Sequence, residues 1–212
     1  MLTIHVAEAS PESAVLVEGA RIAALGPYEE LAAALPQALN SVRAGGTPIP
    51  ARVRRWPGIL TPGLLNPYGP ELLEQAYHPD PREADELGTE PITGERARAV
   101  FRADPSRQGA SARRGVQRLL AHGTVAVAGE LRTRAAQDAV RRAGLAVGHR
   151  PPRLPGPASF SPRPLVLLPG LTVGGPARFA VFDVPGPSAL VRLGASTCVA
   201  TVVAGRLVYR RR

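Results

Sequence analysis

The chain of 212 residues has no lysine, one cysteine and few aromatic residues. A single cysteine, Cys198, excludes an internal disulfide and a zinc site built from several cysteines. The apolar run around Cys198 predicts a buried side chain rather than a reactive thiol. No apolar run approaches the ~18 residues of a transmembrane helix. The N-terminus has no basic segment followed by an apolar core, as a secretory signal would. We therefore expect a cytoplasmic protein that does not use a membrane.

Because lysine is missing, all 26 basic residues are arginines, and the formal net charge is +9. Such a charge can serve nucleic-acid or anionic-surface binding. The arginines are dispersed, however, and aromatic residues, which stack on bases, make up only 4% of the chain. The arginines are densest at Arg52, Arg54 and Arg55 and in the tail 210–212. We interpret the tail as a solvated terminus. We therefore do not expect nucleic acid as a partner.

Alternating apolar residues at the N-terminus predict β-structure. Leu2, Ile4 and Val6 alternate as in a half-buried strand. Residues 14–18 and 21–25 flank a Gly-Ala pair and predict a hairpin. Further along we expect a short helix over residues 28–35 and a loop over 45–48. Two strands should follow, over 53–56 and 59–65.

The middle of the chain divides into a polar part, a periodic part and a proline-rich part. Residues 71–106 are polar and carry several prolines, which predicts a loop with one short helix near residues 95–101. Residues 107–149 then predict, together with the strand over 59–65, a parallel βαβαβ unit. Its expected elements are a helix over 111–122 ended by Gly123, a strand over 124–128, a helix between the N-cap Thr133 and Gly144, and a strand over 145–147. Seven prolines between residues 151 and 169 predict an extended linker.

Three parts of the chain resemble the amidohydrolase superfamily, in the order expected for it. Residues 62–70, PGLLNPYGP, resemble its first barrel strand, P-G-[LIF]-[IVL]-[DN]-x-H-x-H. Residues 14–27 resemble the opening hairpin of its composite domain. Residues 171–183 and 199–209 resemble the closing strands of that domain. The sequence is most similar in character to imidazolonepropionases and aminodeoxyfutalosine deaminases.

The resemblance implies a mixed α/β fold in which the two ends of the chain form a composite β-sandwich and a truncated barrel lies between them. The expected units are a composite domain over 1–58 plus 165–212, a truncated βα barrel fragment over 59–149 and a proline-rich linker over 150–164. A complete (β/α)₈ barrel takes about 250 residues, whereas only 100 residues lie between Pro70 and Leu171.

A sheet cut from a barrel leaves open edges, which invite pairing with another chain. Three arrangements would cover them. The linker could fold back over an edge, residues 71–106 could cover the sheet, or a second chain could pair with it. We expect a homodimer or a partner chain at these edges.

The resemblance also implies zinc or iron and the hydrolysis of non-peptide C–N bonds. The two histidines of the first strand are replaced here by Tyr68 and Pro70, and neither offers a good ligand for such a metal. A chain without lysine cannot form the carbamylated lysine that bridges two metals in many members, and no segment matches the strands that supply the later ligands. We therefore predict a degenerate protein without a cofactor, a pseudoenzyme. The alternative is an active hydrolase whose barrel and metal are completed by a partner subunit.

Candidate ligand-binding residues follow the predicted barrel strands, where this architecture places its active sites. They are Asn66, Tyr68, Glu130 and His149, with Arg150 supplying positive charge to a small-molecule ligand. Glu130 and His149 give only two metal ligands, whereas a catalytic zinc site takes three. Catalytic residues stay unknown.

Two further histidines are interpreted structurally. His78 lies in the polar loop next to Pro79 and Asp80 and predicts an exposed side chain. His122 lies in the last turn of a helix. We interpret it as a capping residue, because a histidine there interacts favourably with the helix dipole.

Overall fold

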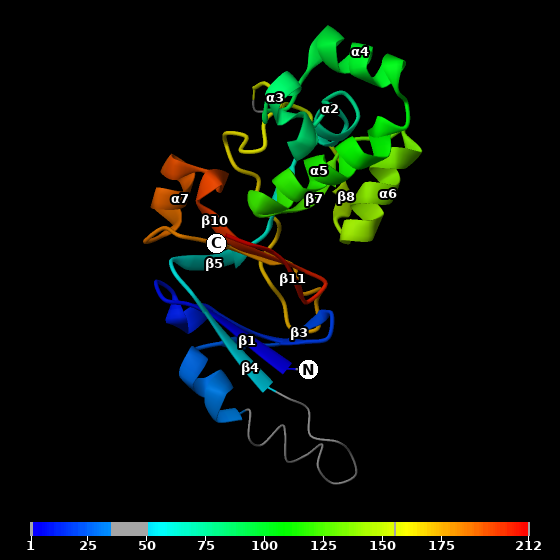
Figure 1. The fold of residues 1–212 in the computed structure, drawn as a ribbon. Helices are drawn as coiled ribbons and strands as arrows, with labels where there is room; N and C mark the ends of the chain where they lie inside the picture. Colours follow the sequence, from blue (N-terminus) through cyan, green and yellow to red (C-terminus); the bar gives the residue numbers. More distant parts are fainter. Residues whose placement is uncertain (1, 35–50, 155, 212) are drawn as a thin grey trace, which may run out of the picture.

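The computed structural model describes residues 2–34, 51–154 and 156–211 (Figure 1). Within these residues the strands form three open sheets, two of four strands and one of three, and none closes into a barrel. The mixed α/β class is therefore confirmed. Among the described helices, none has both the length and the apolar character that a membrane crossing needs.

The first sheet contains the N-terminal strands and has the order β3-β2-β1-β4. Its strands are β1 (Leu2–Ala7), β2 (Ala14–Glu18), β3 (Arg21–Gly26) and β4 (Ala51–Trp56). The predicted hairpin is confirmed, because β2 and β3 pair antiparallel. β1 is buried on both faces instead of one. A helical segment over residues 28–34 covers its outer face through Leu31, and the second sheet covers the inner face.

The second sheet brings the C-terminal strands beside the first, with the order β11-β10-β9-β5. Its strands are β5 (Ile59–Pro62), β9 (Phe179–Phe182), β10 (Cys198–Val203) and β11 (Arg206–Arg210). A single apolar core joins the inner faces of the two sheets, with Val15 and Trp56 from the first and Phe179, Val181 and Val202 from the second. Burial of this core stabilises the facing sheets. Cys198 is buried as predicted, and burial raises the pKa of its thiol to about 11.

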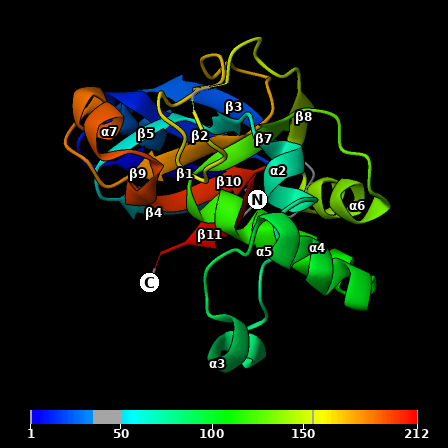
Figure 2. The same cartoon turned by 90° about the horizontal axis from the view of Figure 1, so that it is seen from above.

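The third sheet is parallel, as the βαβαβ pattern predicts, and has the order β6-β7-β8. Its strands are β6 (Leu64–Asn66), β7 (Thr124–Ala128) and β8 (Ala146–Gly148). The two helices between them are α5 (Arg107–Ala121) and α6 (Arg134–Ala143). Apolar side chains of both helices pack with Val125 and Val127 of β7. Figure 2 shows α4 (Gly94–Ala103), α5 and α6 gathered at one end of the molecule and α7 (Pro187–Leu193) at the other.

Two predictions of secondary structure are wrong. The strand expected over 59–65 is two strands, because the chain turns at Gly63 from the second sheet into the third. A Cβ at Gly63 would lie 2.2 Å from Cγ2 of Val125, so only glycine fits this crossing. In residues 71–106 the helix expected near residues 95–101 is confirmed as α4, but the remainder, predicted as loop, also contains short helices. The helices of this segment are α2 (Gly69–Leu73), η2 (Pro81–Glu83), α3 (Ala84–Leu87) and α4 (Gly94–Ala103). The loop expected over 45–48 lies outside the described residues.

A small apolar core and the hydrogen bonds of one glutamate stabilise this helical structure. Tyr77, Ile92 and Ala97 form a buried apolar cluster. The hydroxyl of Tyr77 donates a hydrogen bond of 2.5 Å to Glu83, and Glu83 also completes a capping box with Asp80 at the start of η2. Single prolines therefore begin these short elements instead of breaking them.

Residues 166–168, at the end of the proline-rich stretch 151–169, run along β6. The amide of Leu65 donates to the carbonyl of Val166 at 2.8 Å, and the amide of Leu168 donates to the carbonyl of Gly63 at 3.0 Å. One edge of the third sheet is therefore covered by this segment. The outer edge of β8 has no strand partner in the described parts of the chain.

Candidate functional site

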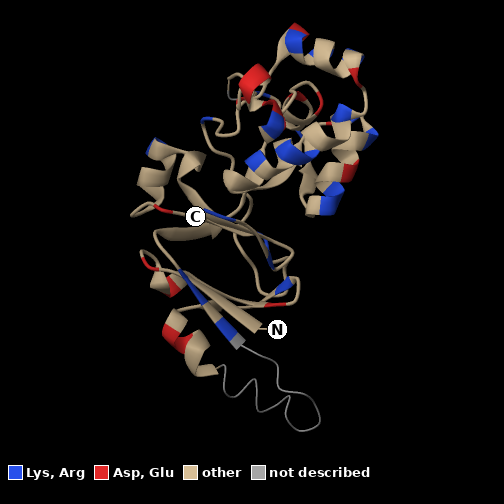
Figure 3. Cartoon of the chain, in the orientation of Figure 1, with Lys and Arg blue, Asp and Glu red and all other residues tan. Residues whose placement is uncertain are grey.

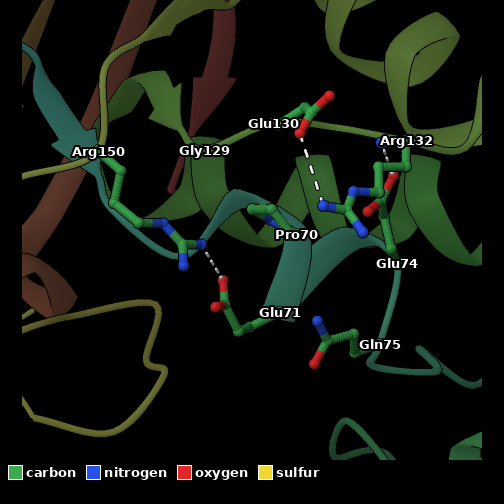
Figure 4. Close-up of a pocket in the computed structure, with 8 residues that line it drawn as sticks. All are labelled: Pro70, Glu71, Glu74, Gln75, Gly129, Glu130, Arg132 and Arg150. Atoms are coloured by element: carbon green, nitrogen blue, oxygen red, sulfur yellow. Dashed lines mark hydrogen bonds and ion pairs between the residues drawn. The ribbon is translucent and has the colours of Figure 1, made fainter.

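A polar pocket lies at the carboxyl end of the third sheet (Figure 4). Its volume is about 410 Å³. Its walls come from α2, the β7–α6 connection and the residue that follows β8 by two positions, and they are strongly charged. The lining residues are Pro70, Glu71, Glu74, Gln75, Gly129, Glu130, Arg132 and Arg150.

Two ion pairs between arginine and glutamate side chains lie at the pocket. Arg150 donates to Glu71 at 2.6 Å, and both side chains are only partly exposed. Arg132 lies 3.6 Å from Glu130, and this pair is largely in solvent, where it contributes little to stability. Figure 4 shows the two pairs on opposite sides of Pro70. The pocket therefore offers carboxylates and guanidinium groups to the same ligand.

Glu74 holds the wall of the pocket in place. Its Oε1 accepts from the backbone amides of Arg132 and Thr133, at 2.7 and 2.6 Å. Thr133 is also the N-cap of α6, as predicted, and its hydroxyl accepts from the amide of Ala136 at 3.3 Å. Glu74 thus links α2 to the beginning of α6.

Gly129 allows the two sides of the pocket to approach. Its φ is +101°, a conformation that other residues adopt only with strain. A Cβ at this position would lie 2.8 Å from Cδ of Pro70 and 3.0 Å from Nη2 of Arg150. The sharp end of β7 therefore sets the position of Arg150 in the pocket.

Asn66 and Tyr68 lie together but turn toward the proline-rich segment. Oδ1 of Asn66 accepts from the amide of Tyr68 at 3.0 Å, and Nδ2 donates to the carbonyl of Ser159 at 2.9 Å. The hydroxyl of Tyr68 donates to the carbonyl of Gly156 at 2.6 Å. Tyr68 is buried, and burial raises the pKa of its phenol. Residues 156–159 therefore cover the end of β6.

The four predicted site residues do not form one cluster. Glu130 and the accompanying Arg150 line the pocket, whereas Asn66 and Tyr68 bond to residues 156–159. His149 is exposed and is not among the lining residues. The sequence analysis missed Glu71, Glu74, Gln75 and Arg132. The first three lie on or just after α2, in a segment predicted as loop, and the spacing of Glu71 and Glu74 on a short helix is the signal that could have found them.

The metal of the amidohydrolase superfamily does not fit the residues at this site. Tyr68 uses its hydroxyl as a donor to Gly156, and the side chain of Pro70 has no ligand atom. Across the described residues, no three His, Cys, Asp or Glu side chains are grouped so that they could hold a metal ion. A zinc site of the usual kind needs at least three such ligands.

His78 is buried, which corrects the prediction of an exposed loop histidine. Nε2 makes a 2.7 Å hydrogen bond with the carbonyl of Leu72, and Phe160 lies edge-on to the ring. Gly115 leaves room for the ring, because a Cβ there would lie 2.7 Å from Nε2. Burial lowers the pKa of His78, so the ring is neutral and packs as part of the core. His122 ends α5, and its Nδ1 bonds to the carbonyl of Arg118 at 2.8 Å, as a cap.

Comparison with models of known protein families gives a match to a composite domain. The model of the imidazolonepropionase-like composite domain of bacteria matches residues 14–38. This segment includes all of β2, all of β3 and the helical segment over 28–34. The resemblance predicted from the opening hairpin is thereby confirmed. A comparison with curated proteins gives no match.

Three solved structures are distant neighbours of the chain. N-isopropylammelide isopropylaminohydrolase from Burkholderia multivorans is 16% identical, with a TM-score of 0.40, over 69% of this chain and 36% of its own. Ochratoxinase from A. niger is 17% identical, with a TM-score of 0.35, over 70% and 30%. Guanine deaminase from Bradyrhizobium japonicum is 18% identical, with a TM-score of 0.35, over 64% and 27%. The chain thus spans between 27% and 36% of the length of these proteins.

Proposed function

We propose that this chain, which carries an imidazolonepropionase-like composite domain, binds a small polar ligand at the carboxyl end of its third sheet without hydrolysing it. The observation that carries the proposal is the hydrogen bond from Tyr68 to Gly156. It directs the residue at the first metal-ligand position of the superfamily into the protein, away from the pocket. Pro70, at the second position, lines the pocket without a ligand atom. Such a chain is an amidohydrolase-like pseudoenzyme.

The chemistry of the pocket favours a cyclic amide or amidine as ligand. Such rings carry N–H donors next to carbonyl or imine acceptors. Glu71 would accept from the donors, and Arg150 would donate to the acceptors, with geometry already set by their 2.6 Å ion pair. Gln75 can supply both a donor and an acceptor at the rim. The volume of about 410 Å³ suits a ligand of this size.

Calorimetry with hydantoin and creatinine tests this proposal, together with an assay for ammonia release and ring opening. We expect binding to the metal-free protein and no hydrolysis, with or without added zinc. Arg150→Gln should weaken binding by about tenfold, because one charge-assisted hydrogen bond is lost. Arg153→Gln, at an exposed position three residues away, is the matched control and should bind as the parent does. Zinc-dependent hydrolysis, or no binding of either ring, would contradict the proposal.

We further propose that the fold is a composite β-sandwich with a truncated barrel inserted. Residues 1–58 and 165–212 form the sandwich, residues 59–149 form the barrel fragment and residues 150–164 connect them. The shared core of the two four-stranded sheets supports the first unit, and the parallel order of β6, β7 and β8 supports the second. The turn at Gly63 favours a boundary just after β5, four residues later than the sequence places it.

A second candidate function is a subunit that a partner chain completes, as a homodimer or with a different protein. The outer edge of β8 favours it, because Val147 on this strand is 60% exposed. Leu131, Val140 and Leu145 line an adjacent cavity of about 600 Å³. Unpaired strand edges of this kind are typical of interfaces.

Light scattering at micromolar concentration, with and without Val147→Asp, tests this candidate. A dimer that dissociates on this substitution would support it, because a buried unpaired carboxylate opposes association. Val191→Asp is the matched control: Val191 is 68% exposed but lies on α7, away from β8. A monomeric parent protein, purified without a second chain, would contradict it.

A further inference from the structure

A cleft of about 320 Å³ lies between the two four-stranded sheets, at their arginine-rich edges. β4 forms one edge of the first sheet, and β11 forms one edge of the second. Figure 3 shows the basic residues of β4 as blue segments along that strand. The lining residues are Arg52, Val53, Arg54, Arg55, Trp56 and Arg210.

Strand geometry places Arg52 and Arg54 on the face of β4 that is turned toward the second sheet. Alternate residues of a strand share a face, so these two arginines lie on the face of Trp56, which is buried in the core between the sheets. Arg210 reaches the same place from the other sheet, with its guanidinium 5.7 Å from the centre of the Trp56 ring. Three guanidinium groups from two strands therefore converge on one cleft.

Within residues 2–34, 51–154 and 156–211 the three arginines have no acidic partner. In the described chain, no ion pair includes Arg52, Arg54 or Arg210. The sequence of residues 35–50, which precedes β4, contains no Asp or Glu. Burial lowers the pKa of Arg54, and repulsion from Arg52 and Arg210 lowers it further. Like charges that are held together without neutralisation are a cost that a bound anion would remove.

The buried histidine that contacts Trp56 beneath the cleft adds no positive charge to it. Nε1 of Trp56 donates to Nδ1 of His5 at 3.3 Å, so this ring nitrogen carries no proton. His5 pairs with Arg54 across β1 and β4, and its pKa is lowered to about 3 by burial and by the charge of Arg54. The positive charge of the cleft therefore comes from the arginines alone.

We propose that this cleft binds the phosphate group of a small phosphorylated metabolite. Guanidinium groups present paired N–H donors that match the oxygens of a phosphate, and a doubly charged phosphate offsets several of them at once. A small metabolite suits the cleft better than a nucleic acid, because Trp56 is only 5% exposed and offers no face for a base to stack on. It also suits the cleft better than a lipid surface, because Val53 is the single exposed apolar side chain in the lining.

Calorimetric titration of the full chain with pyrophosphate and with glycerol 3-phosphate tests the proposal. We expect saturable binding of one phosphate compound per chain. The triple variant Arg52→Gln/Arg54→Gln/Arg210→Gln should lose it. The matched control, Arg113→Gln/Arg142→Gln/Arg153→Gln, removes the same charge from exposed positions without ion pairs in the described chain, and should keep it.

Two further measurements keep the test independent of the folding of the triple variant. Arg54→Lys keeps the charge but not the paired donors, and should weaken binding by about tenfold. Glycerol 3-phosphate should raise the melting temperature of the parent chain above that in sodium chloride of equal ionic strength. Equal loss of binding in the control variant, no saturable binding, or binding only to a single-stranded oligonucleotide or to phosphatidic acid vesicles would overturn the proposal.

Discussion

Tyr68 shows at the scale of one residue how the site differs from that of a metal hydrolase. A histidine here would end the strand with a nitrogen directed at a metal. Tyr68 instead lies 2% exposed, packs in the core with Leu72 and Val116, and donates to Gly156. Its surroundings fit a phenol and bring the proline-rich segment across the strand. The tyrosine at this position therefore has a structural role in the fold.

Tyr68→Phe should therefore behave as a stability variant. Loss of the hydrogen bond to Gly156 should lower the free energy of unfolding by about 1 kcal/mol, measured by urea denaturation. Tyr209→Phe is a suitable control, because no side-chain hydrogen bond of Tyr209 occurs in the described residues. A loss of zinc or of catalytic activity on Tyr68→Phe, without a change in stability, would contradict this interpretation.

His5 should make the stability of the protein depend on pH. Its pKa is about 3 in the folded chain, well below the model-peptide value of 6.5. Between these values the unfolded chain binds a proton that the folded chain does not bind, so stability falls as the pH falls from about 6.5 toward 3. The slope contributed by one such group is at most about 1.4 kcal/mol per pH unit.

Urea denaturation at several pH values measures this dependence. His5→Gln, which keeps an acceptor for Trp56, should reduce the slope below pH 6.5. His149→Gln, at an exposed position, is the matched control. An unchanged slope in His5→Gln would show that other groups, such as the buried His78, account for the pH dependence.

At the scale of elements, the positions that could be predicted are those where local chemistry decides. The β2–β3 hairpin, the Thr133 cap and the stop at Gly144 are set by residues within a few positions of each other. Apart from the helix near residues 95–101, the helices of residues 71–106 could not be predicted, because their stability comes from contacts such as Arg114 with Asp80, 34 positions apart. The same is true of the pocket, where Arg150 meets Glu71 across 79 positions.

A substitution at Gly129 tests whether close contacts at the end of β7 determine the shape of the pocket. Gly129→Ala should destabilise the protein by about 1–3 kcal/mol, because its φ of +101° is strained for alanine and the new methyl group meets Pro70 and Arg150. Gly88→Ala is the matched control: its φ is +76°, but nothing lies within 4 Å of the added Cβ. Thermal denaturation should show a larger loss for Gly129→Ala. Equal losses would mean that the contacts with Pro70 and Arg150 contribute nothing.

At the scale of the whole molecule, three segments determine how the edges and faces of the three-stranded sheet are covered. The proline-rich segment covers β6, α5 and α6 pack on the sheet, and β8 keeps a free edge in the described structure. The sequence predicts that edges must be covered, but not which segment covers which edge. That choice depends on backbone hydrogen bonds between Leu65 and Val166, 101 positions apart, which no local pattern encodes.

The central claim is that this chain acts without a bound metal, and its metal content tests that claim most directly. The measurement is elemental mass spectrometry on tag-free protein purified from its native host, so that any partner chain stays attached. We predict zinc and iron far below one ion per chain, because the described residues include no group of three suitable ligands. Nearly one zinc or iron ion per chain would contradict the account and would restore a metal-dependent hydrolase as the function.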